Sequence, residues 1–304
     1  MSNTKSKARP KFLRALLVTF LAMLPIAGGW IYKVHIYPRP FWIHFYDPEA
    51  AYYYDGAQLV NGELPSHVGH PGTPVQVLSA VIQIFVGSNP LDYDRFRLWA
   101  YTLAGLLTFG AALLLAWQVL ANLPVTLQMT ALWTYFICPQ ALTYNNIWSP
   151  EILYFPFGAI LVIVCWRFLR KELSYLPSLT IGASVGLCCA LKLAFLAWLP
   201  ALALTLLIAK KDNKINRFTL VTVGLVGLAI GFITGTIVIV KKYPLMLNWF
   251  WTLVSRSGYL GSEDNFFPDL ATMLRNLWNY LVSVRKLTFT DGVFKYSESM
   301  FTQK

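Results

Sequence analysis

Long apolar runs separated by short polar breaks make up most of this 304-residue chain. A helix needs about 20 apolar residues to cross a bilayer. Seven runs approach that length and predict membrane spans at residues 14–33, 98–120, 124–143, 151–169, 176–191, 193–209 and 218–240. A shorter run over 75–86 predicts a helix lying at the membrane interface. The expected fold is an all-α polytopic membrane helical bundle, with short juxtamembrane helices in its first external loop.

Lys192 divides the fifth predicted span from the sixth. The apolar sequence from Ile181 to Ile208 is long enough for one continuous helix, but it would place this lysine near its middle. A lysine at the bilayer centre costs about 3 kcal/mol or more. Two spans that meet near Lys192 at the outer face avoid this cost. The lysine could then snorkel to the headgroups or hold the phosphate of a lipid substrate.

The composition supports a membrane protein. Only 13% of the residues are charged, against about 25% in a typical soluble domain, and the mean hydropathy is +0.51. The net charge of +11 could indicate nucleic-acid binding. However, the basic residues lie mainly in short polar breaks, where they set membrane topology. We therefore expect no nucleic-acid partner.

The distribution of charge orients the predicted spans. With a cytoplasmic N-terminus, the inner segments hold twelve of the twenty-five basic residues and only two acidic ones, Glu172 and Asp212. Short loops rich in Lys and Arg stay cytoplasmic. The apolar run after the basic N-terminus favours a retained signal anchor over a cleaved signal peptide. The inner basic residues are Lys5, Lys7, Arg9, Lys11, Arg14, Arg167, Arg170, Lys171, Lys210, Lys211, Lys214 and Arg217.

The stretch from Phe45 to Gln76 carries the densest chemistry, and this orientation places it outside. Asp47 and Pro48 predict a helix start, and Asn61-Gly62 predicts its end. Capping accounts for Asp47 alone but not for the neighbouring acidic residues and tyrosines. A carboxylate at a membrane face can accept a proton from an attacking hydroxyl or amine. We predict catalytic roles for Asp47 and Glu49, and acceptor or sugar contacts for Asp55 and Tyr52.

Further candidates lie at the same predicted face. His70 opens a rigid turn before the interfacial helix and could donate to a phosphate or sugar hydroxyl, or simply sit in the turn. Glu151 could bind acceptor or sugar, or could favour the positive end of its helix. The predicted donor-phosphate ligands are Lys192 and His70, with Arg95, Arg97 and Arg256 as weaker candidates. His67 and His70 give only a weak metal-ligand pattern, and we expect no metal.

These motifs resemble the GT-C glycosyltransferases. The chain is similar in particular to the branch that holds the protein O-mannosyltransferases and the lipid A aminoarabinose transferases. Four segments occur in the order typical of that branch, although Leu191 replaces the usual threonine before Lys192. The segments are Asp47-Pro48-Glu49-Ala50-Ala51-Tyr52, His70-Pro71-Gly72-Thr73-Pro74, Ser149-Pro150-Glu151-Ile152-Leu153 and Gly186-Leu187-Cys188-Cys189-Ala190-Leu191-Lys192.

The resemblance implies a transferase of a bacterial inner membrane with its active site outside. It implies a polyprenyl-phosphate sugar as donor, a lipid, glycan or protein acceptor, inverting displacement and no cofactor. Asp47 would be the acceptor-side base or positioning group, and positive side chains would hold the carrier phosphate. Two alternatives remain open: a lipid or solute transporter or flippase, and a non-catalytic fragment or subunit of a larger transferase.

The expected organisation is a transmembrane core over 1–244, which includes an external loop over 34–97. A second external loop and an amphipathic segment follow over 245–304. Family members usually have more spans, whereas this sequence stops at Lys304. We therefore expect a short relative, a fragment, or a half that works with a partner subunit.

Overall fold

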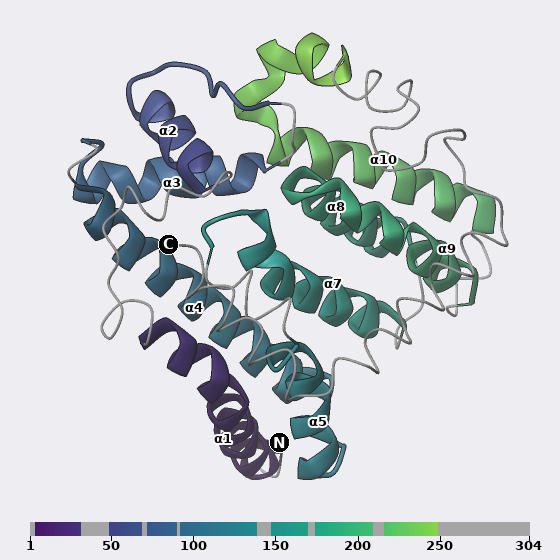
Figure 1. The fold of residues 1–304 in the computed structure, drawn as a ribbon. Helices are drawn as coiled ribbons and strands as arrows, with labels where there is room; N and C mark the ends of the chain where they lie inside the picture. The colour runs from purple at the N-terminus through teal and green to yellow at the C-terminus, as the bar shows by residue number, and fades with distance from the viewer. Residues whose placement is uncertain are drawn as a thin grey trace, which may run out of the picture. The chain divides into compact units, whose positions relative to one another are not determined.

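All regular structure in the described part of the chain is helical (Figure 1). The computed structural model describes residues 4–31, 49–68, 72–89, 92–138, 147–169, 174–208 and 216–248. The chain divides into two compact units, Met1–Tyr243 and Pro244–Lys304. The helices and sites below all belong to the first unit. The predicted second external loop falls outside the described residues from position 249 onward.

Four helices of the described part are long and apolar enough to cross a membrane. They are α1 (Thr4–Ile31), α4 (Tyr93–Gln118), α7 (Tyr154–Leu169) with the short turn before it, and α10 (Arg217–Gly235). They coincide with the predicted spans at 14–33, 98–120, 151–169 and 218–240. The all-helical class is confirmed, and these four helices indicate a membrane protein.

The described residues of the remaining three predicted spans form shorter helices, so the count of seven is not confirmed. The predicted span at 124–143 contains α5 (Val125–Phe136), which has only 12 residues. Helix α8 (Tyr175–Leu191) has 17 residues. The region 193–209 begins as a 3-10 helix, η5 (Leu193–Trp198), and continues as the 10-residue α9 (Leu199–Ile208). A helix rises about 1.5 Å per residue, so α5 and α9 fall well short of the hydrocarbon thickness.

The predicted break at Lys192 is confirmed. Helix α8 ends at Leu191, and Lys192 takes an extended conformation with φ −159° before η5 begins. The lysine therefore lies at a helix end, not in the middle of a span.

The stretch from Phe45 to Gln76 contains helix α2 (Glu49–Val60) and the start of helix α3 (Thr73–Val86). These two helices form a helical hairpin. Gly62 ends α2 as predicted, with φ +77°. The Glu63 N–H donates to the Gln58 carbonyl at 2.8 Å and the Gly62 N–H donates to the Leu59 carbonyl at 3.1 Å. These two bonds form a Schellman cap. Gly56 lets the two helices approach closely, since a Cβ there would lie 2.6 Å from the Cβ of Ser79.

Helix α3 is inverted relative to a helix on the surface of a soluble protein. Its polar side chains Gln76, Ser79 and Gln83 are buried. Its large apolar side chains Ile84 and Phe85 are exposed, the latter to 83%. An exposed apolar face of this kind marks a contact with lipid or another apolar partner. The prediction of a short apolar helix over 75–86 is therefore confirmed, and its polar face points inward to α2.

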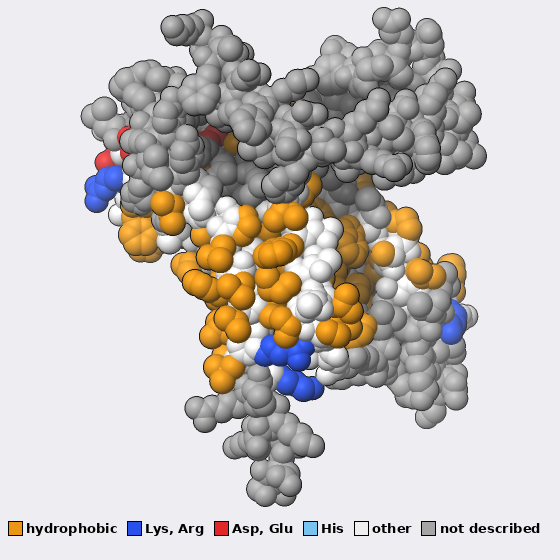
Figure 2. All heavy atoms as spheres, turned by 60° about the horizontal axis from the view of Figure 1, so that its bottom comes forward, with side chains coloured by type: hydrophobic (Ala, Val, Ile, Leu, Met, Phe, Trp, Pro, Cys, Tyr) orange, Lys and Arg blue, Asp and Glu red, His pale blue; other side chains and the backbone are white. Residues whose placement is uncertain are grey.

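Apolar side chains also cover much of the surface outside the hairpin. Figure 2 shows a broad field of them on one face, with basic side chains at its lower edge and acidic ones near its upper edge. At one end of the unit, the Lys11 ammonium donates to the Asn122 side-chain oxygen at 3.0 Å and Arg14 donates to the Leu123 carbonyl. The basic start of α1 therefore lies beside the turn between α4 and α5.

Helices α8 and α10 pack backbone against backbone, and they lie side by side in Figure 1. A Cβ on Gly186 would lie 2.0 Å from the Leu228 carbonyl oxygen, and one on Gly231 would lie 2.0 Å from the Ala183 carbonyl oxygen. Glycines spaced four residues apart allow this approach in membrane helices. This contact sets the position of the end of α8, and so of Lys192.

We predict that Gly186→Ala destabilises the protein by about 1–3 kcal/mol, because the new methyl group meets backbone that cannot move aside alone. The measurement is the thermal stability of the purified protein in detergent. Gly158→Ala is the matched control, since its Cβ would meet nothing within 4 Å. Equal stabilities of the two variants would contradict the close packing of α8 on α10.

Candidate functional site

Three carboxylates of the predicted outer face are buried or nearly buried, and each has a defined set of partners. They are Glu49 and Asp55 in α2, and Glu151 in the short 3-10 helix η4 (Pro150–Leu153). Buried charges are stable only when they are paired and hydrogen-bonded. Their partners therefore define how the outer segments are held together.

Glu49 pairs with Arg97 and is only 1% exposed. The Arg97 Nε lies 3.4 Å from Glu49 Oε1, and the Tyr101 hydroxyl donates to the same oxygen at 3.1 Å. The guanidinium also lies 6.0 Å from the centre of the Tyr93 ring and 5.8 Å from that of Tyr101, within the range of cation–π attraction. This cluster fixes the start of α2 against α4.

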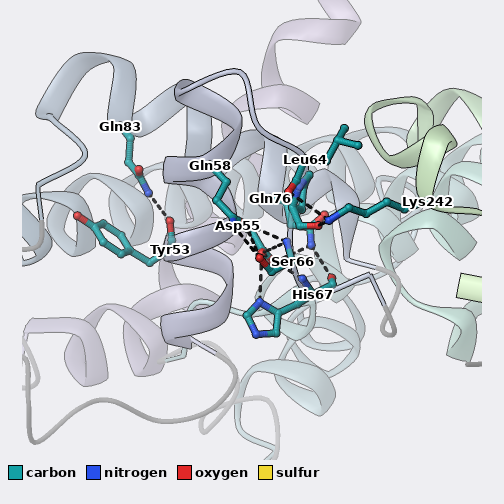
Figure 3. A network of polar contacts seen from close by, with 10 residues as sticks. Tyr53, Asp55, Gln58, Leu64, Ser66, His67, Gln76, Gln83 and Lys242 are labelled. Carbon is teal, nitrogen blue, oxygen red and sulfur yellow. Dashed lines mark hydrogen bonds and ion pairs between the residues drawn. The ribbon is translucent and has the colours of Figure 1, made fainter. Parts of the chain in front are cut away.

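Asp55 is fully buried and binds the loop that connects α2 to α3 (Figure 3). Its Oδ1 accepts from the backbone N–H groups of Ser66 and His67 at 2.9 and 3.2 Å. The same oxygen lies 3.1 Å from His67 Nδ1, and Oδ2 accepts from Gln76 Nε2 at 2.9 Å. Gln58 adds bonds to Ser66 at the surface. The hairpin loop is therefore anchored through one carboxylate.

Lys242 ties a distant helix to this loop. It ends the 3-10 helix η6 (Ile237–Lys242), which follows α10. Its ammonium donates to the Pro65 carbonyl at 2.5 Å and to the Leu64 carbonyl at 3.3 Å. The loop is thus bound from α2, from α3 and from the end of the α10 segment.

Glu151 forms an ion pair with Lys192, two residues that are 41 positions apart in the sequence. The lysine side chain remains 35% exposed and the glutamate side chain 12%. Ser149 stands at the N-cap of η4 but makes no capping bond with its side chain. The structure therefore joins two predicted site residues that lie in different sequence motifs.

Trp148 connects the Glu151 segment to the hairpin, and sequence reasoning missed it. Its indole N–H donates to the Ser79 hydroxyl at 2.7 Å, and its ring packs edge-on against Phe96 with centroids 5.9 Å apart. It is fully buried. One face of the apolar run over 75–86 carries three polar residues, Gln76, Ser79 and Gln83. This pattern could have predicted that a polar group from another segment, such as the Trp148 indole, packs against that face.

An apolar cavity of about 380 Å³ lies between α1 and α4. Phe20 and Met23 of α1 face Gly105 of α4 across it. Tyr101 and Ile152 also line it. The cavity wall therefore includes the tyrosine that binds Glu49 and the residue next to Glu151.

The other predicted residues have different positions. Tyr52 is buried, with its hydroxyl against Gly72 in the turn that follows His70. Arg95 is 73% exposed and lies 3.9 Å from Asp92, whereas Arg97 is buried against Glu49. Asp47, His70 and Arg256 lie outside the described residues.

Tyr53 supports the hairpin without facing solvent. Its hydroxyl donates to the Asn89 carbonyl at 2.8 Å, and its backbone carbonyl accepts from Gln83 at 2.7 Å. Burial, together with the nearby Asp92 carboxylate, raises the pKa of Tyr53 to about 12. The hydroxyl therefore stays protonated at neutral pH and serves as a hydrogen-bond donor.

Comparison with models of known protein families, with curated proteins and with solved structures gives no match. Within the described ranges, no group of three or more His, Cys, Asp or Glu side chains could hold a metal ion. The family resemblance and the expected lack of a metal therefore stay predictions.

We predict that Arg97→Met destabilises the protein by about 3–5 kcal/mol, because it leaves the Glu49 carboxylate buried without its cation. The double variant Glu49→Leu with Arg97→Met should recover much of this loss. Thermal unfolding of the purified variants measures both effects. Arg95→Met, at an exposed site, is the control and should change stability by less than about 0.5 kcal/mol. A double variant no more stable than Arg97→Met would contradict the pairing.

Proposed function

We propose that this chain is an integral membrane glycosyltransferase. It takes a sugar from a polyprenyl-phosphate donor and passes it to an acceptor on the non-cytoplasmic face. The observation that carries the proposal is the ion pair of Glu151 with Lys192. This ion pair joins two of the four segments through which the sequence resembles the GT-C enzymes, the one that contains Glu151 and the one that ends at Lys192.

Lys192 has the properties required of a phosphate ligand. It follows the end of α8, and its ammonium is partly exposed but held by one carboxylate. An ammonium binds phosphate as a point charge, and Glu151 keeps it in place while the site is empty of donor. The other phosphate-binding residues in this proposal are His70, Arg95 and Arg256.

The apolar cavity between α1 and α4 supports a lipid-linked donor. Its volume of about 380 Å³ lies in the range of small-ligand pockets. Its lining is almost wholly apolar, with Tyr101 and Ile152 at its wall. The first isoprene units of the carrier would occupy it, and the phosphate would lie toward Lys192.

The acceptor side is assigned to the start of the hairpin. Asp47 precedes Glu49 by two residues in the sequence and is the proposed acceptor-side carboxylate. Glu49, held by Arg97 and Tyr101, fixes the start of α2. Asp55 and Tyr52 shape the hairpin that faces the acceptor. The acceptor oxygen or nitrogen attacks the sugar carbon directly and inverts it, while the carrier phosphate leaves.

The proposed orientation places this face outside a bacterial inner membrane. The contacts of Lys11 and Arg14 with the turn between α4 and α5 support it, because they gather basic residues and an inner turn at one end. A partner subunit is part of the proposal.

We predict that Asp47→Asn lowers sugar transfer by at least about 100-fold, because the neutral amide holds the O–H or N–H group of the acceptor less tightly than the carboxylate does. The assay supplies purified protein in liposomes with a panel of radiolabelled polyprenyl-phosphate sugars and membrane extract as acceptor source. Glu63→Gln is the matched control, since Glu63 is an exposed carboxylate of the same stretch and should keep full transfer.

Two outcomes of this assay would contradict parts of the proposal. Transfer by the wild-type protein with retained transfer by Asp47→Asn would remove Asp47 from the mechanism. Movement of the labelled lipid between leaflets without transfer to any acceptor would support a flippase instead.

A further inference from the structure

His67 and Asp55 form a dyad with a fixed arrangement of protons. An ionised carboxylate can only accept hydrogen bonds. Asp55 is fully buried and receives two backbone N–H groups and the Gln76 amide in addition to the imidazole. The His67 Nδ1, 3.1 Å from Asp55 Oδ1, must therefore carry the proton that lies between them. In the neutral ring this leaves Nε2 without a proton and able to accept one.

The backbone of His67 is held on both sides, while its ring is open to solvent. Its N–H donates to Asp55 and its carbonyl accepts from Gln76 Nε2 at 2.9 Å. The side chain is nevertheless 58% exposed. Figure 3 shows the ring projecting from the network, with one nitrogen turned to Asp55 and the other turned away.

The network does not require the imidazole for its own stability. Asp55 keeps three further donors if the ring is removed, and Lys242 holds the loop independently through the carbonyls of Leu64 and Pro65. An exposed histidine with one nitrogen oriented by a buried carboxylate has the arrangement of a general base. The second nitrogen is the one free to act.

We propose that His67 Nε2 is the proton acceptor of the transfer reaction and that Asp55 is its positioning residue. This inference rests on the proposed glycosyltransferase function. The acceptor O–H or N–H gives its proton to His67 as the acceptor atom bonds to the sugar carbon. The bond from that carbon to the phosphate oxygen breaks, and the oxygen keeps the electron pair. The Asp55 carboxylate stabilises the resulting imidazolium, which then returns its proton to water. Asp47 in this scheme orients the acceptor.

The arrangement of protons can be measured without any substrate. The chain has four histidines, so protein labelled with ¹⁵N only in histidine gives few ring signals, and comparison with His67→Gln assigns those of His67. We expect the neutral ring to carry its proton on Nδ1. In Asp55→Asn, we expect this preference to be lost. Nε2 protonation of the wild-type neutral ring would overturn the proposal.

Transfer assays then test the catalytic claim. We expect His67→Gln to lose about 100-fold or more of the transfer rate, because glutamine can still donate to Asp55 but cannot take up a proton. The substitution should leave membrane insertion and thermal stability unchanged. His35→Gln is the control of matched residue type and should keep full activity. In His67→Ala, added imidazole should restore part of the rate.

The outcomes separate the two proposals. Wild-type transfer with a folded His67→Gln variant that stays within threefold of it would overturn the role of His67 and leave the transferase function standing. An inactive, folded His67→Ala variant that imidazole does not rescue would also count against a proton acceptor. No transfer by the wild type with any donor would overturn the transferase function, and the catalytic role of His67 with it, whatever the histidine spectra show.

Discussion

The cost of burying charge in an apolar bundle governs the arrangement of the outer segments. A carboxylate removed from water without a partner is strongly destabilising. The structure gives Glu49 the guanidinium of Arg97, Asp55 a shell of four donors, and Glu151 the ammonium of Lys192. The pairs of Glu49 and Glu151 join segments that are more than 40 positions apart, and Asp55 joins its own helix to the following loop and to α3. The acidic residues therefore determine where these segments lie.

The positions of the candidate site residues depend on these buried ion pairs and hydrogen bonds. Glu49 fixes the start of α2 on α4, and Asp55 fixes its loop on α3. Trp148 joins α3 to the segment that carries Glu151. The glycine contact between α8 and α10 sets the helix end that Lys192 follows. The proposed proton acceptor on the hairpin and the lysine after α8 are thus held by separate contacts, which suits the proposed transfer between two substrates.

Local signals in the sequence predicted local structure well. Gly62 ends α2 because only a residue tolerant of positive φ fits there, and Lys192 ends α8 because a lysine avoids the apolar interior. Span number was less predictable, because apolar composition does not show where a helix ends, and α5 ends at Phe136 inside the predicted span at 124–143. Pairings were least predictable. Nothing in the sequence distinguishes the buried Arg97 from the exposed Arg95 or assigns His67 to Asp55.

The central claim is that Lys192 holds the phosphate of a polyprenyl carrier. Native mass spectrometry of the purified protein with polyprenyl phosphate and with the uncharged polyprenol tests it most directly. We predict that the wild-type protein retains the phosphate lipid and releases polyprenol, that Lys192→Met retains neither, and that Lys241→Met, at an exposed lysine, behaves as wild type. Equal retention of the phosphate lipid by wild type and Lys192→Met would contradict the claim.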